Sequence, residues 1–277
     1  EIGVRLVGSE MCIRDRLNIL SEAFVFVDDN PAEREIVRGQ LGGTAVPEIG
    51  EVTDYIRVLD RSGYFETVTL SEDDLKRNDM YRANAQRAKA QSRFADYHDY
   101  LLSLEMTAEI GDFSPLYLQR ITQLTNKSNQ FNLTTKRYTA EQMEAVYNSD
   151  EYIRLYGKLY DKFGDNGVVA VTIGKTDSED KGRLDIELWL MSCRVLKRDM
   201  ELAMLDSLVE QAKKRGIREI YGHYYPTAKN KMVAGLYESF GFEKISQDEE
   251  GNTAWRLLVE GYEDKNTVIK VKEEHYA

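Results

Sequence analysis

The sequence predicts an α/β protein in two parts, a strand–loop–helix unit followed by a mixed α/β domain with a mostly antiparallel sheet. A short apolar run, Phe24–Val27, ends in two aspartates and leads into a helix, which predicts the first part. Beyond residue 100, strand-like and helix-like periods alternate, which predicts the second. The polar, helical stretch 71–100 is typical of a closing helix or connector. We therefore expect domains over 17–100 and 101–277.

Composition excludes several classes of protein. The 277 residues suffice for two ordinary domains, and 42% hydrophobic with 31% charged residues is typical of a globular chain. No apolar run approaches the roughly 18 residues of a membrane span. A net charge of −11 argues against nucleic acid or an anionic membrane as partner. Two cysteines, Cys12 and Cys193, cannot build a disulfide framework, so we expect a cytoplasmic protein.

Each element of the first part has a local signal. Phe24–Val27 is β-rich and apolar, as expected of a buried strand, and Pro31 suits the first turn of a helix over 32–38. A second strand-like piece covers 44–47. Ser71, with an acid three residues later, resembles a capping box at the start of the connecting helix.

The second part of the sequence contains signals for a larger number of elements. Thr139 and Gln142 form a capping box that predicts a further helix start. The amphipathic helix 200–214 has the clearest period and a glycine stop. The expected strands cover 102–108, 151–160, 167–173, 185–191, 217–224 and 253–259, and the other expected helices cover 115–124 and 229–240.

An acidic pair is the first candidate site. Asp28 and Asp29 follow the predicted strand, where ligand sites of α/β sheets form. Two such carboxylates could hold Mg²⁺, which takes one or two protein carboxylates. With equal weight, Asp29 or Asn30 is simply the N-cap of the following helix.

A strand end followed by a helix start gives the second candidate. Arg198-Asp-Met-Glu-Leu-Ala203 opens the 200–214 helix, whose free amides and dipole favour a pyrophosphate. The alternative is an ordinary helix start, with Asp199 and Glu201 favourable in its first turn.

Three side chains are candidates for catalysis. Cys193 lies at a strand end beside arginines and a helix start, surroundings that lower a thiol pKa, and His223 is a possible base for it. Tyr237 could donate a proton to a leaving thiolate. All three have structural alternatives: a small buried hydrophobe, a hydrogen-bonded histidine and a core tyrosine.

A polar loop is the last candidate site. Amide, hydroxyl and ammonium side chains crowd around Phe131, from Asn126, Lys127, Asn129, Gln130, Asn132 and Thr134. They could bind a polar ligand or an acceptor arm, or they could fix the loop itself by side chain–backbone hydrogen bonds.

Residues 1–16 resemble the translation of a sequencing-library adapter. Residues 6–16 match the in-frame translation of a transposon-based read primer, and 1–5 match flow-cell sequence with an index. The segment lacks the apolar core of roughly 7–15 residues and the cleavage site of a signal peptide. We therefore exclude it from fold reasoning, which leaves Cys193 as the native cysteine and a native sequence truncated at Leu17.

The run FVFVDDNPAEREIVR (24–38) resembles the last acidic motif of haloacid-dehalogenase-like (HAD) phosphatases, specifically the FkbH-like family of subfamily IIIC. The similarity extends through 17–270 and includes TNKSNQFNLTT (125–135), FGDNGVVAV (163–171), WLMSCRVLKR (189–198) and YYPTAKNKMV (224–233). The resemblance implies the C-terminal part of a HAD-like Rossmannoid domain followed by a domain like the GCN5-related N-acetyltransferases (GNAT-like).

The resemblance also implies a function. The family dephosphorylates 1,3-bisphosphoglycerate and transfers the glyceryl group to an acyl carrier protein thiol. Asp29 would be the direct Mg²⁺ ligand with Asp28 beside it. We hypothesise in addition that Cys193 holds the acyl group transiently. The family's D-x-D-x-T nucleophile motif is absent from this sequence, so we expect the chain itself to be inactive as a phosphatase.

Resemblance to GNAT acyltransferases implies two alternatives. Arg198 and Ala203 match the coenzyme A turn [RQ]-x-x-G-x-[GA], but Glu201 replaces its glycine. Tyr237 matches the proton-donating tyrosine, and Asn230 is a further expected cofactor contact. The chain could then be an acyl-CoA-dependent acyltransferase, or a non-catalytic domain that docks a carrier protein. Acyl-CoA or carrier-bound phosphopantetheine would be its cofactor.

Overall fold

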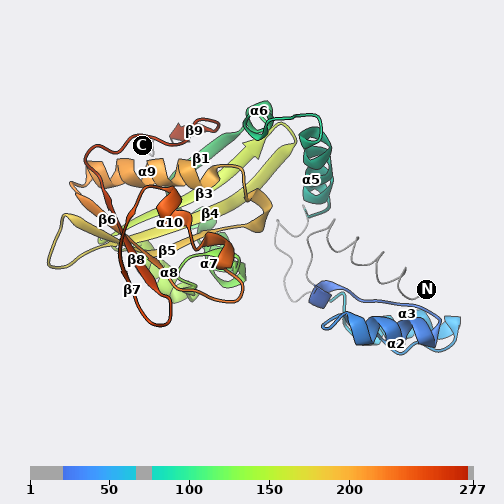
Figure 1. The fold of residues 1–277 in the computed structure, drawn as a ribbon. Helices are drawn as coiled ribbons and strands as arrows, with labels where there is room; N and C mark the ends of the chain where they lie inside the picture. The colour runs from blue at the N-terminus through green and yellow to red at the C-terminus, as the bar shows by residue number, and fades with distance from the viewer. Residues whose placement is uncertain (1–20, 67–76, 274–277) are drawn as a thin grey trace. The chain divides into compact units, whose positions relative to one another are not determined.

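The computed structural model describes residues 21–66 and 77–273 (Figure 1). Contacts divide the chain into two compact units, Glu1–Tyr81 and Arg82–Ala277, and the boundary falls within the helix α5 (Arg77–Gln91). The adapter-like segment and the capping box predicted at Ser71 lie outside the described residues. Among the described helices, none is long and apolar enough to cross a membrane.

The first unit confirms the predicted helix but not the predicted strand. Helix α2 (Pro31–Gln40) begins with proline, and the Asn30 side chain caps it by accepting a hydrogen bond from the Ala32 amide at 3.0 Å. The prediction of a buried strand at 24–27 is wrong: the run is half-buried and makes one parallel bridge, Val25 to Ala45. An apolar run becomes a strand only where partner strands exist, and residues 21–66 supply just this bridge. The remaining elements here are η1 (Ser21–Ala23), η2 (Val52–Asp54) and α3 (Tyr55–Arg61).

The second unit is built on one mixed sheet with the order β7-β8-β6-β5-β4-β3-β1-β9. All neighbouring pairs are antiparallel except β1 with β9 and β5 with β6, which confirms the predicted mostly antiparallel sheet. A short strand, β2, pairs with β5 outside this order. The strands are β1 (Thr107–Asp112), β2 (Phe131–Asn132), β3 (Tyr152–Asp161), β4 (Gly164–Thr176), β5 (Arg183–Met191), β6 (Glu219–Tyr224), β7 (Glu243–Gln247), β8 (Thr253–Leu258) and β9 (Lys270–Glu273).

Helices cover both faces of the sheet (Figure 1). On one face, α7 (Pro115–Lys127) and α8 (Ala140–Tyr147) pack on β4 and β5 through Ile121 and Met143, and the predicted capping box of α8 is confirmed. On the other, α9 (Met200–Lys214) buries Met204 and Leu208, as its period predicts. The shorter helices are α6 (Tyr97–Ser103), η3 (Cys193–Val195), η4 (Lys231–Val233) and α10 (Leu236–Ser239).

Two predicted elements of the second unit are wrong. The strand expected over 102–108 begins only at Thr107, because Leu101 and Leu104, three residues apart, bury one face of the α6 turn. The helix expected over 229–240 is divided into η4 and α10, because the Asn230 side chain bonds back to the Thr227 amide and holds a tight turn. The strands β2, β7 and β9 were not predicted, and every residue of β7 is exposed.

A buried ion cluster joins α5 to the β3–β4 hairpin. The Arg87 guanidinium binds both Asp161 carboxylate oxygens at 2.8 and 2.9 Å. Arg198 donates to the same carboxylate at 3.1 Å. The Asp161 side chain is completely buried. A carboxylate in this position is stable only because two cations and their hydrogen bonds replace its water.

We predict that Asp161→Asn destabilises the protein by roughly 3–5 kcal/mol, because it leaves two buried guanidinium groups without a counter-charge. Glu151→Gln is the matched control, since it removes one partner of the exposed Lys175–Glu151 pair and should cost less than about 1 kcal/mol. Urea denaturation measures both. Equal losses for the two variants would contradict a structural role for the cluster.

Candidate functional site

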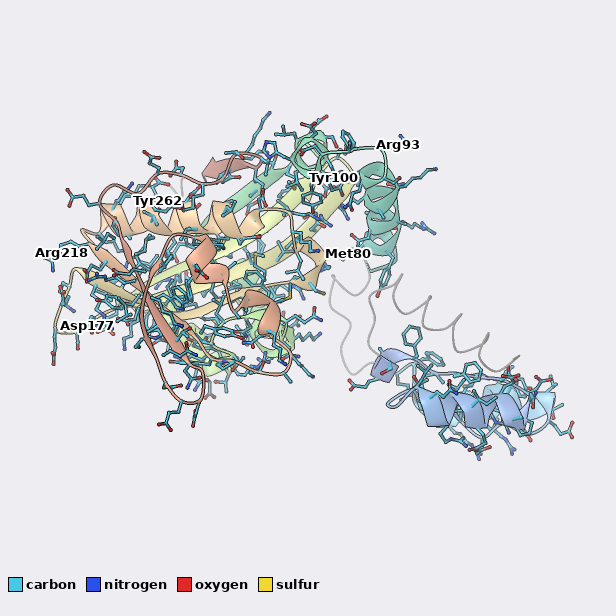
Figure 2. The ribbon with its side chains drawn as sticks, in the orientation of Figure 1. Met80, Arg93, Tyr100, Asp177, Arg218 and Tyr262 are labelled. Atoms are coloured by element: carbon cyan, nitrogen blue, oxygen red, sulfur yellow. The ribbon has the colours of Figure 1, made fainter. Side chains whose placement is uncertain are left out.

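The sheet opens between β5 and β6. The two strands pair in parallel at Arg183–Asp185 and Glu219–Tyr221, and no later residue of β5 pairs with β6 in the described part of the chain. Arg218 and Asp177 lie at the paired end of the sheet, and Tyr100 lies at the other end (Figure 2). Most of the predicted site residues belong to β5, β6 or the segments that follow them.

The strand β2 occupies this opening. Phe131 and Asn132 pair antiparallel with Met191 and Leu190, on the edge of β5 that faces away from β4. The Leu133 amide then donates to the Trp189 carbonyl at 3.1 Å, and the Leu133 carbonyl accepts from the Tyr225 amide at 2.9 Å. The segment 131–133 therefore bridges the two diverging strands.

Asn230, a predicted cofactor contact, fixes the segment in place. It is completely buried, and its side-chain amide donates to the Asn132 and Tyr225 carbonyls at 3.0 and 2.9 Å. Its oxygen accepts from the Thr227 amide at 2.7 Å and faces the Tyr224 hydroxyl at 3.5 Å. Both donors and both lone pairs are thus engaged within the protein.

The polar loop predicted around Phe131 is held by its own side chains. Asn126 donates to the Thr122 and Tyr138 carbonyls, both at 3.0 Å. Thr134 donates to the Glu187 carbonyl at 2.7 Å. These bonds favour the structural alternative, in which side chain–backbone hydrogen bonds fix the loop.

Tyr237 lies beneath β6 with its ring against Gly222. A Cβ at Gly222 would lie 2.3 Å from the tyrosine ring, and Trp189 meets that ring edge-on at 6.3 Å between centroids. The hydroxyl is buried beside the His223 amide and makes no well-formed hydrogen bond among the described residues. Burial raises its pKa far above the ordinary value, so at neutral pH the group can only be an un-ionised donor.

We predict that Gly222→Ala destabilises the protein by roughly 1–3 kcal/mol, because the added methyl group overlaps a rigid, fully buried ring. Gly235→Ala is the matched control, since a Cβ at Gly235 meets no heavy atom of the described residues within 4 Å. Thermal unfolding compares the two. If both variants melt together, Tyr237 does not pack as the structure shows.

The turn before α9 does not fit the predicted pyrophosphate. Arg198 points inward, where it binds Asp161 and lies 3.4 Å from the side-chain oxygens of Asn84 and Asn166, and burial lowers its pKa to about 10. Ala203 is buried in the core. Burial also raises the Glu201 pKa to about 7, although its own backbone amide donates a hydrogen bond to it. The first turn of α9, where a phosphate was expected, therefore contains an acidic side chain.

We predict that Glu201→Gln stabilises the protein in a pH-dependent way. Since the folded-state pKa of Glu201 exceeds the ordinary 4.5, ionisation weakens the fold as pH rises from about 4.5 to about 7. The gain of the variant over wild type should grow from about pH 5 to about pH 8, by at most roughly 3 kcal/mol. Urea denaturation at both pH values measures it. Glu260→Gln, at an exposed position, should show no such growth, and a flat difference for Glu201→Gln would refute the buried charge.

Cys193 and His223 lie at opposite ends of the opening. Cys193 is an exposed, free thiol on η3, just beyond the end of β5. The His223 imidazole lies 3.3 Å from Asp185 and stacks on Tyr225. Asp185 precedes the last residue of β5 by six positions, which is about 20 Å of strand. The structure therefore does not bring these two predicted partners together.

The acidic pair of the first unit lies at a helix cap. Asp28 accepts a hydrogen bond from the Asn30 amide at 2.8 Å, and Asp29 is exposed. Within residues 21–66 and 77–273, no three acidic, histidine or cysteine side chains gather as a metal site. The cap explains the position of Asn30, and the expected Mg²⁺ site at Asp28 and Asp29 stays a prediction.

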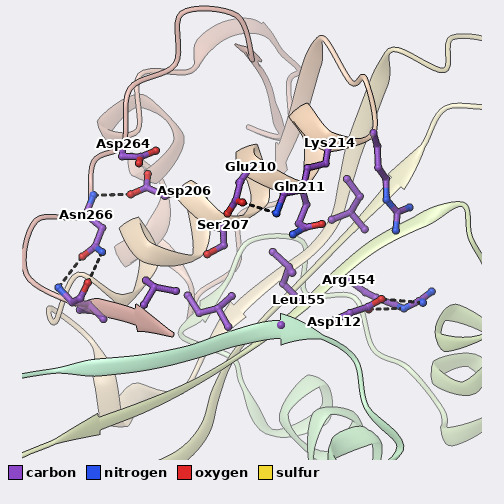
Figure 3. A pocket seen from close by; sticks show the side chains of 16 residues that line it. Asp112, Arg154, Leu155, Asp206, Ser207, Glu210, Gln211, Lys214, Asp264 and Asn266 are labelled. Atoms are coloured by element: carbon purple, nitrogen blue, oxygen red, sulfur yellow. Dashed lines mark hydrogen bonds and ion pairs between the residues drawn. The ribbon is translucent and has the colours of Figure 1, made fainter. Parts of the chain in front are cut away.

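A hollow of about 580 Å³ lies between α9 and the strands β1 and β3 (Figure 3). Four of its charged side chains form two ion pairs: Asp112 with Arg154 at 2.8 Å, and Glu210 with Lys214 at 2.6 Å. Asp206 accepts from the Asn266 amide at 2.8 Å. These contacts indicate a structural role, and none of the predicted site residues lines the hollow.

Comparison with known proteins gives matches to solved structures alone. No family model and no curated protein matches the chain. The ribosomal-protein-S18-alanine N-acetyltransferase from Escherichia coli is 13% identical, covers 58% of this chain and 99% of its own, and has a TM-score of 0.42. YncA from Salmonella typhimurium, solved with its cofactor acetyl-CoA, is 14% identical, covers 57% of this chain and 96% of its own, and has a TM-score of 0.43. A GNAT-family acetyltransferase from Streptococcus pneumoniae is 17% identical, covers 55% of this chain and 99% of its own, and has a TM-score of 0.42.

Proposed function

We propose that the second unit is an acyl-transferring domain that works through Cys193, as the glyceryl-handling part of an FkbH-like protein. The observation that carries the proposal is the exposed thiol. Cys193 is exposed at the open end of β5, whereas Ser192 before it and Val195 in the same short helix are buried. Packing thus presents this side chain to solvent, where a second protein could reach it. In the parent protein, Mg²⁺ held by Asp28 and Asp29 would serve phosphoryl chemistry.

The proposed chemistry is two thioester steps. The Cys193 sulfur attacks the acyl carbon of an acyl phosphate; the sulfur–carbon bond forms, the carbon–oxygen bond breaks and inorganic phosphate leaves. A carrier-bound pantetheine thiolate then attacks the thioester carbon, and the Cys193 thiolate leaves. The nucleophile in both steps is a thiolate. Solvent exposure of Cys193 suits the second step, because a carrier protein must approach from outside.

We predict that incubation with 1,3-bisphosphoglycerate adds a 3-phosphoglyceryl group to the chain, because only the C1 phosphate leaves when the thiol attacks the acyl carbon. Intact-protein mass spectrometry should detect this group as a hydroxylamine-sensitive adduct. Cys193→Ala should abolish the adduct, because the thioester has no sulfur to form on. Cys12→Ala, which removes the other cysteine of the sequence, is the matched control and should keep it. An adduct that survives in Cys193→Ala would overturn the proposal.

A second candidate is an acyl-CoA-dependent acyltransferase with Tyr237 as proton donor. The observation that favours it is the buried Tyr237 hydroxyl beside the opening, which lacks a good hydrogen-bond acceptor among the described residues. Tyr237→Phe should then lower acyl transfer by about 10²–10⁴-fold with the fold intact. If neither Tyr237→Phe nor Cys193→Ala changes the activity of the parent protein, the remaining alternative is a non-catalytic domain that docks the carrier.

A further inference from the structure

We infer that the second unit does not bind coenzyme A, because residues of the chain itself fill the place where coenzyme A would bind. Two separate parts of such a site are filled by groups of the chain itself. The first part is the edge of β5 that faces away from β4, which β2 covers. The second part is the first turn of α9, which contains the Glu201 carboxylate. The inference does not depend on the proposed role of Cys193.

The edge of β5 is the natural place for a linear, amide-bearing pantetheine arm. Such an arm binds a sheet edge as an extra strand does, by hydrogen bonds to unpaired backbone groups. Here the bridge of Phe131 and Asn132 to β5, and the bond from the Leu133 amide to Trp189, use that edge. Phe131, Asn132 and Leu133 are at most 4% exposed, so the segment is part of the core and does not lie over it.

The segment 131–133 is also hydrogen-bonded on the side that faces away from β5. The Tyr225 amide donates to the Leu133 carbonyl, and Asn230 donates to the Asn132 carbonyl. Removing β2 would leave these groups and the β5 edge without partners in the interior. An arm that displaced β2 would therefore have to replace every one of these bonds.

The first turn of α9 is closed to phosphate by charge. Glu201 lies in the first turn of α9, and one oxygen of its carboxylate is buried without a hydrogen-bond partner among the described residues. Asp199 adds a second acid at the same helix end. Arg198, the arginine that matches the coenzyme A turn, is held by the buried Asp161. A pyrophosphate at this turn would meet two acidic side chains, and its expected arginine partner is already bound.

The test is binding of coenzyme A and acetyl-CoA to the full chain near neutral pH. Isothermal titration should give no saturable heat at millimolar ligand. Hydrogen exchange should show the Leu133 and Tyr225 amides equally protected with and without ligand. Saturable binding would overturn the inference, whether or not exchange at 131–133 rises.

Variants test whether β2 and the Glu201 carboxylate are what prevents coenzyme A from binding. Glu201→Gly combined with Asn230→Ala removes the carboxylate and loosens β2, so coenzyme A should bind at least tenfold more tightly than to wild type. Glu260→Gln with Asn230→Ala is the matched control and should not gain binding, because it leaves Glu201 in place. Circular dichroism and exchange in α9 confirm that the variants fold. A folded Glu201→Gly, Asn230→Ala protein that still fails to bind coenzyme A would overturn the assignment of these groups as the occupants.

Discussion

The arrangement of the second unit depends on one constraint, which is that the buried edge of β5 must be hydrogen-bonded. β5 and β6 diverge after three paired residues, and an interior strand edge without partners would be costly. The segment 131–133 satisfies that edge and also binds Tyr225 beyond β6. Asn230 is then required at the crossing point, where its four hydrogen-bonding positions join β2 to the loop after β6. The polar loop around Phe131 contains the segment 131–133 and connects it to the rest of the chain.

Charged groups at the start of α9 also face the interior of the second unit. Arg198 comes directly before α9 in the sequence, yet its guanidinium is used by Asp161 on the β3–β4 hairpin, together with Arg87 from α5. Glu201, one turn later, is buried with a raised pKa. An acidic helix start whose arginine faces inward is poorly suited to phosphate, even though its amides and dipole alone would favour an anion. Cys193, which follows β5, is by contrast a free thiol exposed to solvent.

Local signals predicted the elements whose stability is local. The α9 period, the Thr139 capping box and the Pro31 helix start were all confirmed, because each needs only neighbours within a few residues. The strand expected at 24–27 and the helix expected over 229–240 failed for the complementary reason. The first needs partner strands, and the second is broken by an Asn230 side chain whose partners are far away in the sequence.

For the site, the sequence by itself determined which residue types were present: a cysteine after β5, an arginine before α9, a glutamate in the first turn of α9, and an asparagine after β6. It also indicated that replacing glycine with Glu201 weakens a phosphate site. The tertiary structure decided what these residues do. Whether Arg198 faces solvent or Asp161, and whether Asn230 meets a cofactor or the Asn132 carbonyl, depends on contacts between segments up to 98 positions apart. Such contacts leave no periodic or spacing signal in a single sequence, because they are set by how the sheet closes.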